Sequence, residues 1–492
     1  SAKSGDTITI REGDYYITKR IYQKDKSLNI IGEGKVTLYL QTAEGVNNGL
    51  YFAGSMITNK PLSANAKNDS SQIVLTDASQ VRQNDLIKIW KDVQWCPLDD
   101  PGQMTGEVYV VKSVKGNVVT LTETLLRDYS TSNNSKLIVY RPIEMHIKNL
   151  YIQDSGATKQ HEGIALRYCI NSSVENCHVK DSGFAGISFY CSYNVTAYNN
   201  DVRNCILPGS GYGIGIWSGT AYADIDSNYL ENCRHCVTLN TDRRDTLVRR
   251  VYVHHNDCIG ATIAGSIVID AHPIAIDWIV EQNEIKVQPG FYALNDGALI
   301  STFSNNNVYG GYGAVIRRGS VNGGLHVIKD NVIEGTSDSF IYRAWGSGKG
   351  ETLVITNNSQ SRGRYGVYLS SEHPESYKNV IIDGNHFTNI LNQGVYQKFL
   401  INGVNLKISN NTFENINLEG IYIDGNSFAN EDAKIQNNIF INVYPSSPGS
   451  EITIKNIPNP SVSGNQMLKA PVAAFSASTD NHRKSTTDSY VY

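Results

Sequence analysis

Six charged or titratable side chains in the middle of the chain have residue types that acid–base chemistry uses. They are Asp242, Asp270, His272, Asp296, Arg317 and Arg343. Two carboxylates about 5 to 10 Å apart can divide the acid and base roles of a reaction such as glycoside hydrolysis. Like charges held close together also raise the pKa of one carboxyl group, as an acid catalyst requires. We therefore predict catalytic roles for Asp242, Asp270, His272 and Asp296.

The basic members of this group add two further functions. His272 follows Asp270 by two residues and could act as a base that this carboxylate orients. Arg317 and Arg343 could clamp an anionic group of a ligand through paired hydrogen bonds. A simpler interpretation remains open, in which Asp270 and His272 belong to a surface turn and the run 242–245 forms a solvated, salt-bridged loop.

A repeat along the chain indicates the elements that would position these side chains. Eleven asparagines recur at intervals of 23 to 28 residues, namely Asn200, Asn228, Asn256, Asn283, Asn306, Asn331, Asn358, Asn385, Asn411, Asn438 and Asn465. A fixed period of this length is typical of solenoids. Each repeat also contains short Gly-apolar-x-apolar strands, such as 213–216 and 366–369, and leaves no room for a helix. The pattern predicts a parallel β-helix.

The repeated asparagines have a structural explanation. Asparagine tolerates the left-handed backbone of a tight turn, and its amide can form hydrogen bonds with the equivalent residue of the next coil. We therefore expect a ladder of stacked asparagines rather than eleven catalytic residues.

In a β-helix, outward side chains of equivalent strands stack coil on coil and form a long groove. Aligning the Gly-apolar-x-apolar strands predicts one outward row, which reads Arg167, Tyr190, Trp217, Asn240, Asp270, Asn295, Arg317, Arg343, Ser370, Lys398 and Asp424. From this row we predict that substrate contacts come from Tyr190, Trp217, Asn240, Asn295, Arg317 and Arg343. Tyr190 and Trp217 would stack on sugar rings. His254 and His255 fall on another strand, away from the groove.

The repeat divides the chain into four parts. We expect the β-helix to start within 1–63, a small antiparallel β domain to be inserted over 64–141, regular coils to occupy 142–471, and 472–492 to form a polar tail. The predicted fold class is all-β, a single-stranded right-handed parallel β-helix of about 12 or more coils with the small inserted domain near the N-terminus. The first residues read as the middle of a domain, which suggests that the chain is part of a longer protein.

Composition narrows the choice of partners. The net charge of −4 gives no indication of a nucleic-acid partner, and no apolar run is long enough to insert into a membrane. Cys233 and Cys236 lack the second half of a metal site, and Cys205 shares a repeat position with Cys233, so we predict buried core cysteines. The 29 tyrosines, against 12 phenylalanines, suit a surface that binds polar ligands such as sugars.

The chain resembles the pectate-lyase-like superfamily of right-handed β-helices, and within it the bacteriophage tailspike type. The opening motifs over 5–8 and 13–16 and the inserted strands over 85–87 and 118–121 carry this resemblance. It implies a polysaccharide partner, a location outside the cell or on the virion surface, and a homotrimer. It also implies calcium as a candidate cofactor, since acidic residues hold calcium in lyases of this superfamily. No other cofactor is expected, and no residue is assigned to a metal.

Three functions stay open at this point. The carboxylates favour a polysaccharide depolymerase that acts by hydrolysis. A uronan lyase or epimerase is an alternative, because Asp270-Ala271-His272 resembles the Asp-Pro-His-Asp signature of mannuronan epimerases, although the proline and the second aspartate are missing here. The other alternative is a non-catalytic adhesin or tail fibre, since the superfamily motifs are specific to the fold and not to a reaction.

Overall fold

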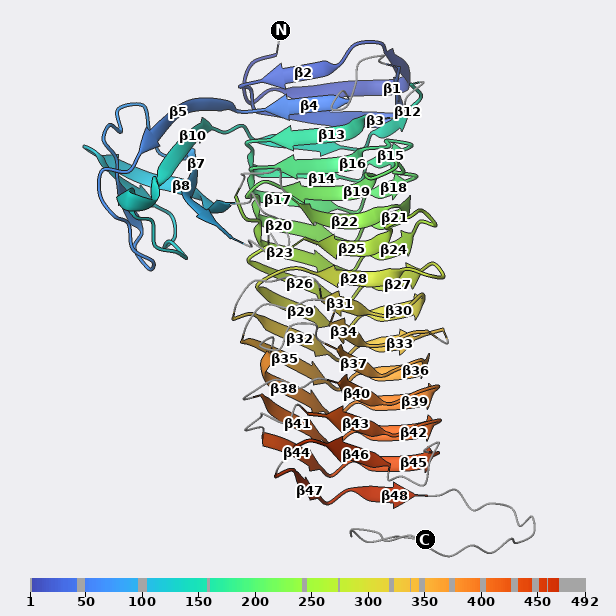
Figure 1. Ribbon diagram of the computed structural model, residues 1–492. Coiled ribbons are helices and arrows are strands. Elements are labelled where there is room, and N and C mark those ends of the chain that lie inside the picture. The colour runs from blue at the N-terminus through green and yellow to red at the C-terminus, as the bar shows by residue number, and fades with distance from the viewer. Residues whose placement is uncertain are drawn as a thin grey trace, which may run out of the picture. The chain divides into compact units, whose positions relative to one another are not determined.

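The computed structural model describes residues 2–41, 49–95, 104–156, 160–240, 246–272, 275–317, 323–336, 338–344, 350–370, 377–398, 404–425, 432–444, 451–457 and 459–468. The chain divides into two compact units, residues 1–283 and 284–492. In each unit, successive coils contribute strands to three parallel ladders, which we number in the order in which a coil reaches them. Figure 1 shows the strands of each ladder one above another.

In the first unit, the first ladder contains β2 (Ile21–Lys24), β4 (Leu50–Ala53), β13 (Glu162–Arg167), β16 (Ala185–Tyr190), β19 (Tyr212–Trp217), β22 (His235–Asn240) and β25 (Ile267–Ala271). The second contains β11 (Met145–Lys148), β14 (Ile170–Glu175), β17 (Tyr193–Tyr198), β20 (Ala221–Asp226), β23 (Arg249–His254) and β26 (Asp277–Glu281). The third contains β12 (Tyr151–Asp154), β15 (His178–Lys180), β18 (Asp201–Arg203), β21 (Tyr229–Cys233) and β24 (Asp257–Gly260). The long strand β3 (Leu28–Leu40) pairs with β1 (Thr7–Ile17) and with both β11 and β12.

The second unit repeats this arrangement. Its first ladder contains β28 (Tyr292–Asp296), β31 (Val315–Arg317), β34 (Tyr342–Ala344), β37 (Val367–Ser370), β40 (Val395–Lys398), β43 (Ile421–Asp424) and β46 (Ile452–Lys455). Its second contains β29 (Ile300–Ser304), β32 (Leu325–Lys329), β35 (Glu351–Thr356), β38 (Tyr377–Asp383), β41 (Asn405–Ser409), β44 (Asp432–Gln436) and β47 (Ser461–Ser463). Its third contains β27 (Glu284–Val287), β30 (Asn307–Gly310), β33 (Val332–Glu334), β36 (Ser359–Gly363), β39 (His386–Ile390), β42 (Thr412–Ile416), β45 (Ile439–Val443) and β48 (Gln466–Leu468).

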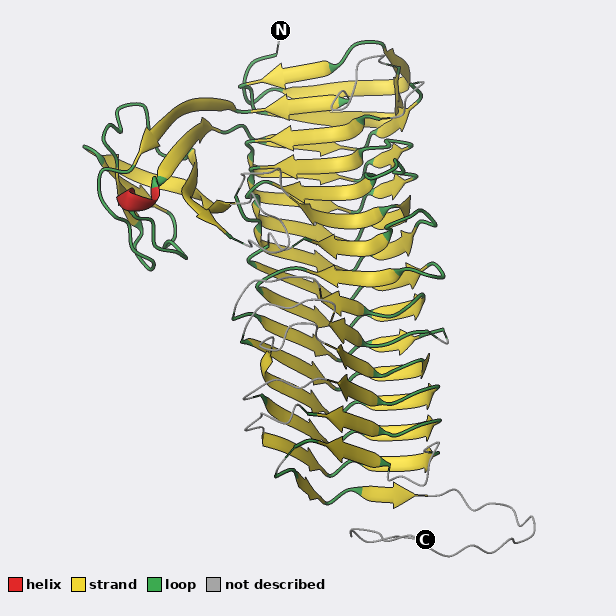
Figure 2. Ribbon diagram, viewed as in Figure 1, coloured by secondary structure: helices red, strands yellow, loops and turns green. Residues whose placement is uncertain are grey.

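The antiparallel part belongs to the first unit. Its strands are β5 (Ser55–Pro61), β6 (Gln72–Val74), β7 (Leu86–Gln94), β8 (Met104–Lys115), β9 (Val118–Leu121) and β10 (Lys136–Arg141), in the spatial order β5-β10-β7-β8-β9-β6. A single turn of 3₁₀ helix, η1 (Thr131–Asn133), lies in the same part and is the red element of Figure 2. In the described residues no helix is long and apolar enough to cross a lipid bilayer.

These observations confirm the predicted fold class, a right-handed parallel β-helix with a small antiparallel β insertion. Seven first-ladder strands in each unit satisfy the expectation of about 12 or more coils. The antiparallel pairing already begins at β5, before residue 64. The predicted polar tail, 472–492, lies outside the described residues.

The repeated asparagines form a buried hydrogen-bonded ladder, as predicted. Asn358 is representative: its backbone N–H and its side-chain amide both donate to Oδ1 of Asn385, at 3.0 and 2.9 Å. The side-chain amide also donates to the carbonyl oxygens of Ile328 and Thr356. The Oδ1 atom of Asn358 accepts two hydrogen bonds from Asn331 in the previous coil. Each rung therefore satisfies buried polar groups of three consecutive coils.

The prediction that the repeated asparagines themselves adopt the left-handed backbone conformation is wrong. The left-handed residue is the one before each rung, for example Asn357 with φ 55° and Asn410 with φ 57°. This residue makes the turn and is exposed at Asn357, so the rung that follows it points into the core. The two tasks that we assigned to one asparagine are divided between neighbours.

Like side chains stack inside the coils. In the second unit, Phe387, Phe413 and Phe440 are buried, with ring centroids 5.1 Å apart from coil to coil. In the first unit, seven cysteines, among them Cys205, Cys233 and Cys236, are buried as free thiols. This confirms the predicted core role; Cys96 lies outside the described residues.

A buried ion pair joins the antiparallel part to the coils of the first unit. Glu123 accepts hydrogen bonds of 2.7 and 3.0 Å from Arg249, whose side chain is fully buried. Tyr193 and Tyr222 also donate to Glu123, and Arg249 donates to the carbonyl oxygen of Val108 in β8. Burial acts to raise the pKa of Glu123, but the hydrogen bonds and the charge of Arg249 outweigh it, so the pKa lies below its usual value.

We predict that Asn358→Ala lowers the free energy of unfolding by about 2 to 4 kcal/mol, because it removes the partner of buried polar groups in two neighbouring coils. Chemical denaturation measures the loss, and hydrogen exchange of the Asn331 amide should show it locally. The control is Asn357→Gly at the exposed turn position, where glycine keeps the left-handed backbone and little change is expected. Equal losses in the two variants would contradict the structural role of the ladder.

We predict that Glu123→Gln costs about 3 kcal/mol of stability near neutral pH, since it leaves the buried Arg249 guanidinium without its counter-charge. The pKa of Glu123 is lowered by folding, so its contribution is complete above the unfolded pKa and disappears as the pH falls through the folded pKa. Denaturation of both proteins from pH 7 to pH 3 should show their difference shrinking in acid. The exposed Glu33→Gln is the control and should match the wild-type protein at each pH.

Candidate functional site

The outer face of the first ladder carries the predicted row over four coils of the first unit. Arg167 pairs with Tyr190, Tyr190 with Trp217, and Trp217 with Asn240. These residues end strands β13, β16, β19 and β22 at equivalent positions. The strand register therefore confirms that they are neighbours on one face.

At Asp270 the strand register differs from the one that we predicted for the row. The strand partner of Asp270 is Thr238, and not Asn240 as the row predicted. Leu239 pairs with Ala271, so His272 lies next to the end of β22. The shift amounts to two residues, so it leaves Asp270 on the same face of the strand. The chain takes 32 residues from Leu239 to its strand partner Ala271, against 23 from Trp217 to Asn240, and the alignment of glycines did not account for this longer coil.

The predicted row also changes register in the second unit. Arg317 pairs with Asp296 on the preceding strand and with Ala344 on the following one. Arg343 instead pairs with Ile316, and Ile316 pairs with Asn295. Arg317 and Arg343 are consequently not equivalent positions of adjacent strands, as the row supposed. Asn295 and Asp296 are both buried, at 4% and 2% exposure.

Asp270 lies between two histidines in the first unit. Its Oδ2 atom is 3.0 Å from Nε2 of His272 and 3.6 Å from Nε2 of His235. The Asp270 carboxylate is almost fully buried, while the His272 side chain is 39% exposed. A carboxylate accepts only, so His272 donates its Nε2–H to Asp270 and carries its lone pair on Nδ1. This arrangement gives a solvent-accessible base oriented by a buried carboxylate.

His235 is held in its neutral form. Its Nδ1–H donates to the carbonyl oxygen of Ile267 at 2.7 Å, and its Nε2 accepts from Nη1 of Arg234 at 2.7 Å. Burial lowers the pKa of His235, the nearby Asp270 carboxylate opposes this shift, and the charge of Arg234 adds to it. Tyr212 stacks over the His235 ring at a centroid distance of 5.7 Å.

Trp217 is not the projecting platform that we predicted for sugar stacking. Its ring lies over the backbone of Gly215, where an added Cβ would come within 2.4 Å of the ring, and only 7% of the residue is exposed. It packs edge-on against Phe184 and Tyr212. Tyr190 is half-buried beneath the guanidinium of Arg167, 4.7 Å from its ring centroid. Tyr212 connects this aromatic cluster to the Asp270 group, because its ring also stacks on His235.

Asp296 belongs to a different buried cluster, in the second unit. Its Oδ2 atom accepts from Oγ of Ser301 at 2.6 Å and lies 2.9 Å from Nδ1 of His326. His326 is buried, and its Nε2 lies 3.9 Å from Oε1 of the buried Glu351.

Two of the predicted residues fall outside what the structure describes: Asp242, with the whole segment 241–245, and the side chain of Arg317.

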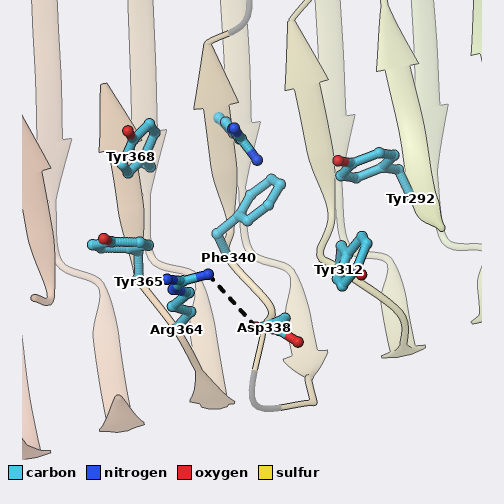
Figure 3. A pocket seen from close by; sticks show the side chains of 8 residues that line it. Tyr292, Tyr312, Asp338, Phe340, Arg364, Tyr365 and Tyr368 are labelled. Carbon is cyan, nitrogen blue, oxygen red and sulfur yellow. Dashed lines mark ion pairs between the residues drawn. The ribbon is translucent and has the colours of Figure 1, made fainter. Parts of the chain in front are cut away.

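The second unit contains a pocket of about 560 Å³ that includes Arg343. Its lining residues are Tyr292, Tyr312, Asp338, Phe340, Arg343, Arg364, Tyr365 and Tyr368. Figure 3 shows the aromatic rings around the pocket and the ion pair between Asp338 and Arg364. That pair is 3.9 Å long and half exposed, so it neutralises Arg364 only weakly. Arg343 lies 5.3 Å from the ring centroid of Tyr368. The pocket thus combines aromatic faces with two guanidinium groups.

A row of tyrosines leads from this pocket along the first ladder. Tyr368, Tyr396 and Tyr422 are strand partners on β37, β40 and β43, and their rings are stacked with centroids 5.2 and 5.3 Å apart. All three are partly exposed. Burial, followed by the neighbouring tyrosine hydroxyls, raises the pKa of Tyr396 to about 12, so this ring stays neutral at physiological pH. The Nζ atom of Lys455 lies 5.2 Å from the Tyr422 ring centroid.

Sequence reasoning missed most of the pocket and the tyrosine row. The signal was present in the strands that defined the repeat, because Tyr368 and Tyr422 occupy the x of the Gly-apolar-x-apolar pattern, and Tyr396 occupies the same place in a strand where Gln397 replaces the second apolar residue. That position points outward, two residues before the one from which the predicted row was read. His235 and its partner Arg234 were not among the predicted residues. His235 does share a strand with Asn240, which the prediction included.

Comparisons with known proteins support the fold. Residues 102–269 match the family described as periplasmic copper-binding protein (NosD), and residues 289–487 match the right-handed beta helix region. Among curated proteins, none matches the chain.

Solved structures with a similar fold include three phage tailspikes, each 15% identical to this chain. Tailspike gp61 of Pseudomonas phage phi297 has a TM-score of 0.63, with 89% of this chain and 71% of the tailspike covered. The gp54 tailspike of Acinetobacter baumannii bacteriophage AP22, solved in complex with a capsular saccharide of A. baumannii, has a TM-score of 0.57 and coverages of 94% and 74%. Tailspike gp49 of Pseudomonas phage LKA1 has a TM-score of 0.55 and coverages of 93% and 75%. The chain therefore has the right-handed β-helix fold that these tailspikes share.

We predict that Asp270→Asn lowers the pKa of His235 further, because it removes the negative charge that opposes the effect of burial. Nuclear magnetic resonance titration of the histidine ring protons measures this shift. The signal of His178, which lies on the third ladder beside Asp201, serves as the internal control and should not move. A raised or unchanged His235 pKa in the variant would contradict the electrostatic contact with Asp270.

Proposed function

We propose that this protein binds and cleaves an extracellular or cell-wall polysaccharide, with the glycan lying along the outer face of the first ladder. The observation that carries the proposal is the pocket of the second unit together with the row formed by Tyr368, Tyr396 and Tyr422. Partly exposed aromatic faces repeated from coil to coil suit the apolar faces of successive sugar rings. Their hydroxyl groups can exchange hydrogen bonds with sugar hydroxyls.

The charges of the pocket favour an acidic polysaccharide. Arg343 and Arg364 face one acidic lining residue, Asp338, so the lining carries an excess of positive charge. Guanidinium groups bind carboxylates through paired hydrogen bonds. A uronate, or another sugar that carries a carboxylate, is therefore the preferred ligand. Arg317 is retained as a separate proposed substrate contact.

For cleavage we propose His272 as the proton-transfer group. Asp270 accepts the Nε2–H of His272, which directs the Nδ1 lone pair away from the carboxylate and supports the charge that the ring gains on taking up a proton. This Asp–His pair would serve β-elimination from a uronate, and it would serve hydrolysis in combination with a second carboxyl group. We retain Asp242 as the acid proposed for that role, Asp296 as a proposed catalytic residue of the second unit, and Tyr190, Trp217, Asn240 and Asn295 as groups proposed to position the substrate.

The comparisons support the choice of substrate class. One tailspike with the same fold was solved with a bacterial capsular saccharide. By analogy we propose that this protein acts outside the cell or on a virion surface, as a homotrimer. Binding without cleavage, as in an adhesin, is the alternative that the same tyrosine row and pocket would also serve.

The test separates binding from cleavage with two variants. Acidic and neutral bacterial surface polysaccharides are incubated with the wild-type protein, and reducing ends and ultraviolet absorbance are recorded together. Asp270→Asn should lower the cleavage rate on the order of 10²-fold or more and keep binding. Tyr368→Ala should weaken binding about tenfold, the equivalent of about 1.4 kcal/mol.

Tyr198→Ala, an exposed tyrosine on the second ladder of the first unit, is the matched control and should leave both properties unchanged. Reducing ends that appear with new ultraviolet absorbance identify elimination, and reducing ends alone identify hydrolysis. A polysaccharide that binds and yields no product would contradict cleavage and support the adhesin. Binding that survives Tyr368→Ala unchanged would contradict the proposed groove.

A further inference from the structure

Three metal-ligating side chains converge on the outer face of the second ladder in the first unit. Asp226 ends β20, His254 ends β23, and the two residues are strand partners on adjacent coils. His255 follows directly. The Oδ1 atom of Asp226 lies 3.3 Å from Nδ1 of His254 and 3.4 Å from Nδ1 of His255, and the two Nδ1 atoms are 2.7 Å apart. These three side chains are not part of the first-ladder groove.

The surroundings fix the tautomer of His254. Its Nε2 lies 2.7 Å from Oδ1 of Asp224, and a carboxylate can only accept, so Nε2 carries the proton. Nδ1 of His254 therefore presents a lone pair to Asp226 and His255. Tyr252 stacks on the His254 ring at a centroid distance of 3.8 Å and holds its orientation. A carboxylate behind the far nitrogen of a histidine is the usual outer support of a metal ligand.

The distances suit a small divalent ion. Tetrahedral ligands about 2.1 Å from a metal lie about 3.4 Å from one another, which is close to both distances from Asp226 to the histidines. The contact between the two Nδ1 atoms is shorter, as expected when His255 donates a proton to His254. A metal ion would replace that proton, with His255 protonated on Nε2 instead, and would widen the contact by about 0.7 Å. The His255 side chain is 51% exposed, so it has room to move.

We propose that Asp226, His254 and His255 bind one divalent transition-metal ion, with Asp224 as the outer support of His254. Two imidazoles and one carboxylate suit Zn²⁺, Ni²⁺ or Cu²⁺ rather than Ca²⁺ or Mg²⁺, which prefer oxygen ligands. Three protein ligands leave a further position for water or another donor. The ion would fasten β20 to β23 across adjacent coils. Glu281, the strand partner of His254 on the next coil, adds negative charge nearby.

This site is independent of the proposed polysaccharide function, and its test needs no substrate. Tag-free, metal-stripped full-length protein is titrated with Zn²⁺ by calorimetry and with Co²⁺ by visible spectroscopy. We expect one ion per chain, visible Co²⁺ bands typical of a four-coordinate site, and a higher melting temperature with Zn²⁺.

His255→Asn should lower the affinity at least tenfold, and asparagine is chosen because residue 255 has φ 51°, which asparagine tolerates. Asp224→Asn should lower the affinity 10- to 100-fold while one ion is still bound at saturation. His178→Gln, a histidine next to Asp201 without a second histidine beside it, is the control and should bind like the wild-type protein. Circular dichroism confirms that each variant is folded. Absence of binding in the wild-type protein, or unchanged binding in His255→Asn, would overturn the proposal.

Discussion

The hydrogen-bonded asparagine ladder is the constraint on which the rest of the structure depends. A rung such as Asn358 bonds to the next rung and to carbonyl oxygens of its own and the preceding coil, and it accepts from the preceding rung. Buried amides of this kind are costly unless each partner is present, so every coil must return to the same place before the next can begin. The ladder thereby fixes where the second and third ladders meet, while the turns elsewhere are free to vary in length.

This division between a constrained core and variable turns is consistent with the places where we propose functional side chains. The first ladder is connected to the others by turns of unequal length, and its outer face carries the groups that we propose for binding and cleaving a polysaccharide. Asp270, His235 and His272 belong to this ladder in the first unit, and the pocket with Arg343 belongs to it in the second. The core behind both is built from stacks of like residues, such as Phe387, Phe413 and Phe440. Variation on the surface is therefore compatible with a repetitive interior.

The sequence was sufficient for the fold and insufficient for the exact register of the groove. Period and strand pattern reveal the coils because the core demands the same residue types at each return. The position of Asp270 opposite Thr238 depended on the length of one coil, which is longer than the period predicts. The burial of Trp217 depended on Gly215, since the absence of a side chain there lets the ring lie flat. The pairing of Asp270 with His235 joins residues more than thirty positions apart, and only the coil geometry brings them together.

The equal spacing of Tyr368, Tyr396 and Tyr422 has a consequence for how a long ligand would move. Tyr368 and Tyr396 are each followed after one coil by an equivalent ring in nearly the same orientation, tilted by 15° and 14°. A flexible polymer displaced by one coil would exchange each contact for a matching one, so many binding positions have similar free energy. For the proposed polysaccharide, such a surface would provide a track with low barriers to sliding, and the number of equivalent alignments would add to the affinity of each contact.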